Sequence, residues 1–235
     1  MTDPSLVIAE VFGPTVQGEG PSTGRRASFI RLGACNLHCT WCDTPYTWDA
    51  RRFDLRAELT RTPVDEIASR ALAGDPGIVV ITGGEPLLHQ HRPGWAALLE
   101  ALNDAGVEVE VETNGTLAPT TETAGRVARF NVSPKLAHSG DLERDRIKPR
   151  ALKALVETGR AIFKFVCATA DDVDEVRHLA DTHGLPARTV WVMPEGTDTA
   201  ALDEHLAVIT DPAIAAGFNL TTRLHVHVWG NERAR

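Results

Sequence analysis

Three cysteines within eight residues are the feature of this sequence best suited to metal chemistry. Cys35, Cys39 and Cys42 lie in the segment CNLHCTWC, and the fourth cysteine of the chain, Cys167, follows far along the sequence in an apolar run. Ordinary iron–sulfur clusters take four cysteine ligands, so three thiolates from one loop leave one iron without a protein ligand. An open iron can bind and activate a small molecule, which makes this loop the candidate reaction centre.

A structural zinc site is the alternative, but it normally takes a fourth well-placed Cys or His. His38 stands between two of the cysteines, where its side chain is expected to point away from a metal that they bind. A disulfide framework requires an oxidising compartment and a small, cysteine-dense domain, whereas this chain has four cysteines in 235 residues. The spacing therefore favours an iron–sulfur cluster over zinc.

The composition fits a soluble protein with a large core. The chain has 235 residues, 43% of them hydrophobic, and no linker divides it, so we expect a single domain over residues 1–235. The net charge of −8 argues against sequence-independent binding to the phosphates of nucleic acids. Residues 1–5 lack the features of a signal peptide, and no stretch approaches the roughly 18 apolar residues of a membrane span. We therefore expect a cytoplasmic protein.

The hydrophobic pattern predicts strands that alternate with helices. Residues 78–81 are fully apolar, as in a strand buried on both faces of a parallel sheet. Residues 64–72 carry apolar side chains on one helical face, behind an expected N-cap at Thr62. Strands are expected at residues 6–12, 27–33, 78–81, 107–111, 130–133, 161–166 and 189–193, and helices at 62–72, 95–103, 120–128, 149–158, 171–182 and 198–210.

This alternation indicates βαβ units around a parallel sheet. A full eight-fold barrel takes about 250 residues, and the first 60 or so are spent here on the cysteine region, so the expected fold is α/β, an incomplete (β/α) barrel of about six parallel strands. Residues 13–20 are expected to form an irregular glycine-rich loop, and residues 218–229 to be extended.

Polar, glycine-rich segments follow four of the expected strands. They are Thr82–Pro86, Glu112–Gly115, Ser133–Lys135 and Met193–Gly196. Each segment alone could be turn chemistry, but binding residues in such folds gather at the C-terminal ends of the strands. Four of them at strand ends favour a ligand site, in which Glu85 and Glu112 could pair with an ammonium group.

Two further features lie close to the cysteines in the sequence. Arg31 interrupts the apolar run of residues 27–33, so it either snorkels at a strand end or anchors an anion such as a carboxylate. Gln17 and Glu19 are flanked by glycines, which fits either a flexible turn or a loop that approaches a ligand closely.

The cysteine spacing followed by Gly83-Gly84-Glu85-Pro86 resembles the radical S-adenosylmethionine (SAM) superfamily. The segments that narrow this resemblance are Phe12–Gly20, Arg31, Trp41–Thr44, Glu112–Gly115 and Ser133–Lys135. Together they are similar to the 7-carboxy-7-deazaguanine synthases, a family of queuosine and 7-deazapurine biosynthesis. The similarity extends from the first strand to the C-terminal region.

The resemblance implies a carbon–nitrogen lyase that converts 6-carboxy-5,6,7,8-tetrahydropterin to 7-carboxy-7-deazaguanine with loss of ammonia. It implies a [4Fe–4S] cluster, SAM and Mg²⁺ as cofactors. SAM would bind the open iron, yield a 5′-deoxyadenosyl radical that takes hydrogen from C6 of the pterin, and be regenerated. No side chain is assigned as catalytic, because the cluster and SAM carry the radical chemistry. The family also implies a homodimer and an electron donor such as flavodoxin or ferredoxin, without nucleic acid or membrane partners.

The resemblance also assigns site residues position by position. The cluster would be held by Cys35, Cys39 and Cys42, and Mg²⁺ by Thr44. SAM is expected at Gly84, Glu85, Glu112, Ser133, Pro134 and Lys135, with residues 193–196 completing its pocket. The pterin is expected at Val16, Gln17, Gly18, Glu19, Arg31 and Thr82, with Arg31 facing its carboxylate.

The C-terminal region departs from the family pattern, in which the final residue, often a proline, reaches the substrate. Here residues 229–235 read WGNERAR. Arg223, His225, His227 and Trp229 alternate as they would on one face of a strand, which either lines the pocket or, the favoured interpretation, faces solvent. Cys167 is expected to be structural, as a small buried hydrophobe.

Two other functions share parts of this pattern. A glycyl-radical-activating enzyme has the same cysteine spacing but needs a protein partner and binds no pterin, and the Gln17–Gly20 loop and Thr44 count against it. A non-catalytic zinc or cluster scaffold is the third hypothesis.

Overall fold

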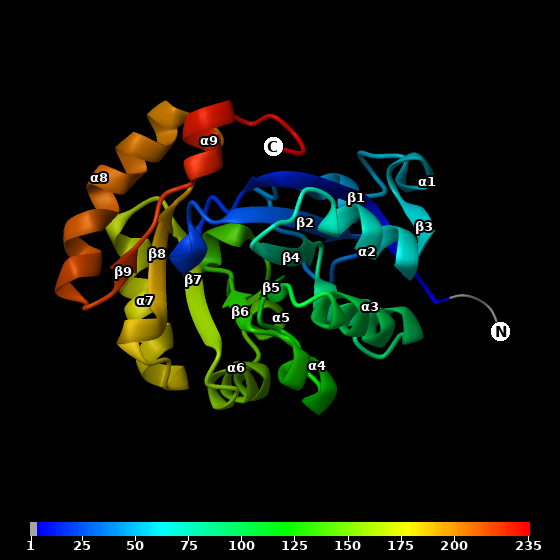
Figure 1. Cartoon of the computed structure of the whole chain (residues 1–235). Helices are drawn as coiled ribbons and strands as arrows, with labels where there is room; N and C mark the ends of the chain where they lie inside the picture. The colour runs from blue at the N-terminus through cyan, green and yellow to red at the C-terminus, as the bar shows by residue number, and fades with distance from the viewer. Residues whose placement is uncertain (1–3) are drawn as a thin grey trace.

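The computed structural model describes residues 4–235, which form one curved sheet with helices on its outer side (Figure 1). The strands are β1 (Ser5–Val16), β2 (Arg26–Leu32), β3 (Thr60–Pro63), β4 (Ile78–Gly83), β5 (Glu108–Thr113), β6 (Arg129–Val132), β7 (Ala161–Cys167), β8 (Val190–Pro194) and β9 (Asn219–Leu220). The helices are α1 (Leu55–Glu58), α2 (Val64–Leu72), α3 (Pro93–Asp104), α4 (Thr121–Arg126), α5 (Glu143–Arg146), α6 (Pro149–Glu157), α7 (Ala170–His183), α8 (Thr199–Ala215) and α9 (Leu224–Trp229). Within residues 4–235, no helix has the length and apolar character needed to cross a membrane.

The sheet confirms the predicted incomplete barrel. Its strand order is β3-β1-β2-β4-β5-β6-β7-β8-β9, and the edge strands β3 and β9 are not paired with each other. All neighbours from β2 to β9 are parallel, while β1 is antiparallel to both β2 and β3. The parallel part therefore contains the six expected strands β2 and β4–β8, followed by the two-residue β9.

The core explains why the central strands read as apolar runs. Val79 and Ile81 of β4 belong to the main core, which lies between the sheet and its helices. Ile78 and Val80 point to the opposite face, where they pack with residues of β2. All four side chains are fully buried, as expected for a parallel strand covered on both faces.

Three boundary predictions are wrong at the ends of elements. β1 continues to Val16 through the predicted loop, because Thr15 and Val16 pair with β2 after a register shift that follows Phe12. The helix predicted from Thr62 begins at Val64, with Pro63 at its N-cap, because Thr60–Pro63 pairs with β1 as strand β3.

The third correction concerns residues 218–229, which were expected to be extended. Only Asn219–Leu220 form a strand, and Leu224–Trp229 form helix α9. Residues two positions apart do not share a helical face, so the alternating residues predicted there do not form one side of a strand. The helix is joined to the loop after β1, where the Leu224 amide donates to the Gly18 carbonyl at 2.9 Å.

One polar cluster lies inside the curved sheet, below the ends of the strands. The fully buried Glu110 of β5 accepts hydrogen bonds from Ser22 Oγ at 2.6 Å and from Asn131 Nδ2 at 2.8 Å. Arg129 Nη1 lies 3.2 Å from the same carboxylate. Because Ser22 belongs to the loop between β1 and β2, Glu110 joins this loop to the centre of the sheet.

Replacement of Glu110 by Ala is predicted to lower the free energy of unfolding by about 3 kcal/mol, because it leaves Arg129 and two hydrogen-bond donors without their buried acceptor. Urea unfolding monitored by circular dichroism measures the change. Glu108→Ala is the matched control on the same strand, since Glu108 makes a half-exposed pair with Arg25 and should cost less than about 1 kcal/mol. Equal losses in both variants would contradict the role given to Glu110.

Candidate active site

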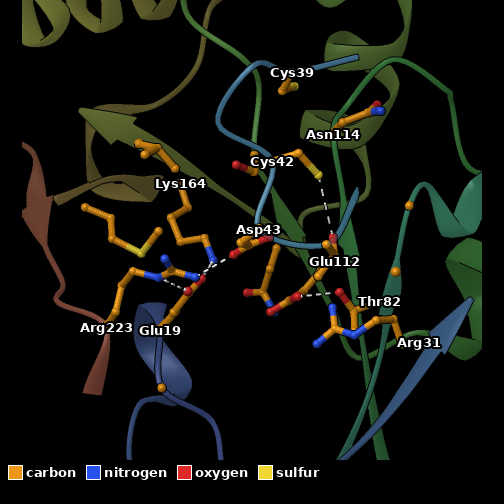
Figure 2. Close-up of a pocket in the computed structure, with 18 of the residues that line it drawn as sticks. Glu19, Arg31, Cys39, Cys42, Asp43, Thr82, Glu112, Asn114, Lys164 and Arg223 are labelled. Carbon is orange, nitrogen blue, oxygen red and sulfur yellow. Dashed lines mark hydrogen bonds and ion pairs between the residues drawn. The ribbon is translucent and has the colours of Figure 1, made fainter. Parts of the chain in front are cut away.

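A pocket of about 240 Å³ lies at the C-terminal ends of β4–β8. Its walls also include the cysteine loop, the end of β1 and the segment before α9 (Figure 2). The predicted site residues that line it are Val16, Gln17, Gly18, Glu19, Arg31, Cys35, Cys39, Cys42, Thr44, Thr82, Gly84, Glu112, Ser133 and Lys135. The lining also includes Met193, Glu195 and Gly196 of the predicted segment 193–196. The structure thus brings the predicted residues together from distant parts of the chain, apart from Glu85, Pro134 and Pro194, which lie outside the lining.

The cysteine loop begins at a residue with unusual backbone geometry. Ala34 has a φ of +73°, a left-handed conformation that L side chains rarely adopt. It is held there by two backbone hydrogen bonds of 2.8 Å, from its own amide to the Thr47 carbonyl and from the Glu85 amide to its carbonyl. The turn directs the following thiols into the pocket.

The other end of the loop is fixed by the segment after β6. The Thr40 amide donates to the Ser139 carbonyl at 2.9 Å, and the His38 amide donates to Asp141 Oδ1 at 3.1 Å. Leu37 is buried beneath the loop. The ring of His38 packs edge-on against Trp48 and lies outside the pocket lining, in keeping with its expected orientation.

The three thiols of the loop fit the predicted cluster. All are free, and all line the same pocket. The Leu37 amide lies 3.5 Å from Cys35 Sγ and Trp48 Nε1 lies 3.4 Å from Cys42 Sγ, so N–H donors face two of the sulfurs. Within residues 4–235, no three His, Cys, Asp or Glu side chains converge on a point as ligands of a single ion would. In a cubane cluster each thiolate binds a different iron, so such convergence is not required.

Burial makes two of these thiols, Cys35 and Cys39, weaker acids than usual in the absence of metal. It raises the pKa of Cys35 to about 11 and that of Cys39 to about 12. Thiolates are the forms that bind metals, so the positive charge of the bound iron must displace these protons.

Two glycines at the end of β4 let the cysteine loop pack closely against the strand. Gly83 has a φ of +135°, and a Cβ atom at Gly84 would lie 1.9 Å from the Ala34 carbonyl oxygen. Any side chain at Gly84 would therefore push the cysteine loop away from the strand end.

Glu85 does not reach the pocket. Its fully buried carboxylate accepts hydrogen bonds from the Leu87 amide at 2.9 Å, Thr113 Oγ1 at 2.8 Å and the Asn114 amide at 2.7 Å. Burial raises the pKa of this carboxyl group despite these donors. The predicted direct contact between Glu85 and a SAM ammonium has no support in this geometry, because Glu85 connects the end of β4 to the end of β5. Pro134 is also buried and lies outside the lining.

Glu112 presents a carboxylate at the end of β5. Thr82 Oγ1 donates to its Oε2 at 2.7 Å, and Gln17 Nε2 donates to its Oε1 at 3.2 Å. The carbonyl end of the Gln17 side chain accepts from the Glu19 amide at 3.1 Å. These contacts fix Glu112 at the boundary between the residues predicted for the pterin and those predicted for SAM.

Glu19 is the centre of a buried ion-pair network (Figure 2). It pairs with Lys164 and with Arg223, whose Nε lies 2.9 Å from Glu19 Oε1. Arg223 Nη2 in turn lies 2.6 Å from Asp43 Oδ2, directly after the last cysteine of the loop. Burial would raise the pKa of Glu19, but the charges of Lys164 and Arg223 outweigh it and hold that pKa well below its usual range.

Several residues that line the pocket were not among the predicted site residues. Lys164 is a charged residue inside the apolar run of β7, and this break in the pattern is the sequence signal of its position in the pocket. Arg223 and His225 line the pocket, so the favoured interpretation that they face solvent is wrong. A Cβ atom at Gly18 would lie 2.0 Å from His225 Nδ1, which shows how closely the two segments approach. Asn131 also lines the pocket and carried no signal.

Lys135 and Trp41 also line the pocket. Lys135 Nζ lies 3.0 Å from Ser133 Oγ and 5.4 Å from the centre of the Trp41 ring, and this ring stacks on that of His138. A cation and an aromatic face thus stand beside the cysteine loop, an arrangement suited to a ligand with a carboxylate and a flat heterocycle.

Comparison with known proteins agrees with the family resemblance that the sequence motifs indicate. Residues 29–164 match the model of the radical SAM superfamily. The chain is 40% identical over 233 residues to a 7-carboxy-7-deazaguanine synthase of Pyrobaculum aerophilum, covering 99% of this chain and 98% of the relative. It is 36% identical over 227 residues to the enzyme of the same name from Hyperthermus butylicus, covering 95% of this chain and 92% of the relative.

Solved structures show the same similarity. The crystal structure of QueE from Escherichia coli superimposes with a TM-score of 0.67 at 26% identity, covering 94% of this chain and 95% of that one. SuiB of Streptococcus suis, solved with its precursor peptide SuiA, gives a TM-score of 0.57 at 16% identity, covering 83% of this chain and 47% of that one. The second similarity concerns the fold alone.

The structure predicts different outcomes for two cysteine substitutions. Cys42→Ala should lose bound iron and sulfide after anaerobic reconstitution, because it removes one thiol from the pocket. Cys167→Ala should retain both, because the Cys167 side chain is fully buried in β7 and lies outside the pocket lining. Iron and sulfide analysis, together with the visible absorption spectrum, measures the result. Loss of the cluster from Cys167→Ala would contradict the three-ligand site.

The Glu19 network predicts a pH-dependent contribution to stability. Because the folded-state pKa of Glu19 lies below its ordinary value of 4.5, its ionisation stabilises the fold at neutral pH, and this contribution is lost as pH falls through the lowered pKa. Glu19→Gln should cost about 3 kcal/mol at neutral pH, and the cost should shrink as the pH falls below the ordinary value.

Urea unfolding of the wild type and of Glu19→Gln, from neutral pH to below the ordinary pKa of a glutamate, measures the difference in their free energies of unfolding. The exposed Glu204→Gln serves as the control. A cost for Glu19→Gln that does not vary with pH would show that charge is not what holds the network.

Proposed function

The chain belongs to the radical SAM superfamily and, within it, to the 7-carboxy-7-deazaguanine synthases, and on this basis we propose how its pocket carries out that activity. The reaction is the conversion of 6-carboxy-5,6,7,8-tetrahydropterin to 7-carboxy-7-deazaguanine with loss of ammonia, a step of queuosine and 7-deazapurine biosynthesis. The observation that carries the proposal is the single pocket in which the three-cysteine loop faces the residues predicted for SAM and for the pterin.

The cysteine loop provides the cofactor site. Cys35, Cys39 and Cys42 would hold a [4Fe–4S] cluster, and when bound, the cluster and SAM supply the electron and the hydrogen-abstracting radical chemistry of the superfamily. The Trp48 N–H group donates to Cys42 Sγ at 3.4 Å and so helps to fix the position of that ligand. The close packing at Gly84 keeps the end of β4 against the loop.

Lys135, Ser133 and the backbone at Gly84 would bind SAM. Lys135 supplies the positive charge that a SAM carboxylate requires, and Ser133 holds the ammonium of Lys135 in place. Trp41 lines the pocket beside Lys135, where its ring would contact the heterocycle of SAM. Glu85 contributes indirectly, because it fixes the Asn114 backbone beside the loop.

Arg31, Gln17 and Thr82 would bind the pterin on the other side of the pocket. Arg31 is a cation at the pocket wall suited to the substrate carboxylate. Gln17 and Thr82 both donate to Glu112, so Glu112 keeps acceptor capacity for N–H groups of a ligand where the two binding regions meet. The positive charges of Lys164 and Arg223 are balanced by Glu19 and Asp43, and Arg31 is paired through its Nε with Glu10. Lys135 and the Nη groups of Arg31 would therefore bind the carboxylate groups of SAM and of the pterin.

Thr44 would contribute a hydroxyl ligand to Mg²⁺. It lines the pocket, and its Oγ1 lies 3.8 Å from Cys42 Sγ. A single hydroxyl suits a hard cation that retains water and shares its remaining ligands with substrate oxygens. This assignment accounts for the Mg²⁺ of the family without a dedicated cluster of carboxylates.

The remaining features are proposed on the same basis. One continuous sheet extends from Ser5 to Leu220, which supports a single domain. A cytoplasmic location, a homodimer and a flavodoxin or ferredoxin as electron donor follow from the family.

Anaerobic reconstitution with iron and sulfide, followed by SAM, a reductant and the carboxypterin, tests the proposal. We expect 7-carboxy-7-deazaguanine and ammonia without stoichiometric consumption of SAM. Addition of Mg²⁺ should increase the rate, and Thr44→Val should reduce this increase, while iron content stays unchanged. Cleavage of SAM with the pterin untouched would reject the substrate assignment and favour an activating enzyme with a protein partner. A colourless zinc protein would favour the scaffold.

A further inference from the structure

Glu10, in the middle of β1, connects the pocket to the last residues of the chain. Its Oε1 accepts hydrogen bonds from Arg31 Nε at 2.7 Å and from the Tyr46 hydroxyl at 2.9 Å. Its Oε2 accepts from Arg233 Nε at 3.0 Å. One carboxylate, with only 12% of its side chain exposed, therefore serves two guanidinium groups and a phenol.

The contact with Arg31 is built into the sheet. Glu10 and Arg31 are directly paired residues of the antiparallel strands β1 and β2, so their side chains leave the sheet on the same face. Because Glu10 takes the Nε hydrogen of Arg31, the two Nη groups remain available to a ligand. Glu10 thereby sets which edge of the guanidinium faces the pocket that Arg31 lines.

The contact with Arg233 holds the segment Gly230–Arg235, called here the C-terminal segment. Arg233 also donates from Nη1 to Glu58 Oε2 at 2.9 Å, and its guanidinium lies 3.8 Å from the centre of the Tyr46 ring. Arg235, two residues further on, is part of the pocket lining. Docking of Arg233 against β1 and the 3-10 helix Pro45–Thr47 therefore brings the C-terminal segment to the pocket.

The two guanidinium groups depend on each other through Glu10. Without its charge, Arg31 and Arg233 would be like charges held near one uncharged side chain, and both would lose their shared carboxylate. The pKa of Glu10 is lowered because the charge of Arg31 and the Tyr46 and Arg233 donors outweigh the effect of burial, which agrees with an ionised carboxylate at neutral pH. Loosening one arginine changes the position of the carboxylate that orients the other.

We propose that Glu10 is a positioning residue that couples docking of the C-terminal segment to the binding of an anionic substrate group by Arg31. The inference rests on the proposed role of Arg31 as the carboxylate-binding residue. Coupling of this kind is reciprocal, so substrate binding stabilises the docked segment to the same extent that the docked segment favours substrate binding.

Glu58 offers a matched control. It binds Arg233 but makes no contact with Arg31, and it lies outside the pocket lining. Glu58→Gln should therefore leave the Glu10 contacts of both arginines in place, so the C-terminal segment should stay docked and Arg31 should keep its orientation. Glu10→Gln keeps the size and one acceptor oxygen of the side chain but removes the charge that serves both arginines.

The test compares cluster-loaded wild type, Glu10→Gln and Glu58→Gln in two measurements. Steady-state kinetics should show KM for the carboxypterin raised about tenfold or more in Glu10→Gln, the size of effect expected from one charge-assisted contact. KM for SAM should be unchanged, and kcat should change much less than KM for the pterin. In Glu58→Gln, KM for the pterin should stay close to that of wild type.

Hydrogen–deuterium exchange of the peptide that contains the C-terminal segment gives the second readout. In wild type and in Glu58→Gln, the carboxypterin should slow this exchange. In Glu10→Gln, exchange should be fast and insensitive to the carboxypterin.

The coupling would be overturned by a Glu10→Gln enzyme in which KM for the pterin is that of wild type, or in which the pterin still slows exchange of the segment. A third variant, Arg31→Gln, shows whether such a result would reject the coupling through Glu10 or the proposed role of Arg31 itself. An unchanged KM for the pterin in Arg31→Gln would reject Arg31 as the carboxylate-binding residue. A raised KM in Arg31→Gln combined with a normal Glu10→Gln enzyme would reject only the role of Glu10.

Discussion

The pocket depends on one buried carboxylate that holds four distant segments of the chain together. Glu19, in the loop after β1, pairs with Lys164 of β7 and with Arg223 before α9, and Arg223 continues to Asp43 at the end of the cysteine loop. A buried charge is tolerated only when it is paired, so each member of this network restricts the position of the others. These ion pairs link the loop after β1 to β7 and to the segment before α9, which lie far from β1 in the strand order of the sheet.

Pairing also distinguishes two kinds of charged side chain in the pocket: those whose charge is neutralised by other residues and those that can bind a ligand. The cations around Glu19 are neutralised within the protein, whereas Lys135 and the Nη groups of Arg31, whose Nε is bound to Glu10, have capacity for ligand carboxylates. Glu112, held by hydroxyl and amide donors, lies between these two regions. Glu85 shows the opposite arrangement, because its oxygens accept hydrogen bonds from the Leu87 amide and from Thr113 and Asn114 at the end of β5. The geometry therefore separates residues that bind ligands from residues that position the binding residues.

Much of the fold and site could be predicted because local chemistry and strand-end position carry the information. Apolar runs such as residues 78–81 mark buried parallel strands, and the parallel topology brings the segments that follow them to one edge. The direction of a single side chain is not determined in this way, which is why Glu85 was placed in the pocket although it is buried beneath it. The C-terminal helix was missed because its alternation of polar and apolar residues imitates a strand, and because its position depends on contacts with Gly18 that only the folded chain brings close. Lys164 was missed for a related reason, since its partner lies 145 residues away in sequence.

The central claim is that three thiols hold the cluster and that one iron remains free of protein ligands for SAM. The most direct measurement is a crystal structure of the anaerobically reconstituted protein with SAM bound. The account predicts a [4Fe–4S] cluster ligated by Cys35, Cys39 and Cys42, with SAM at the fourth iron and Lys135 near its carboxylate. Ligation of that iron by Asp141 or another side chain, or a single tetrahedral metal between the thiols, would contradict it.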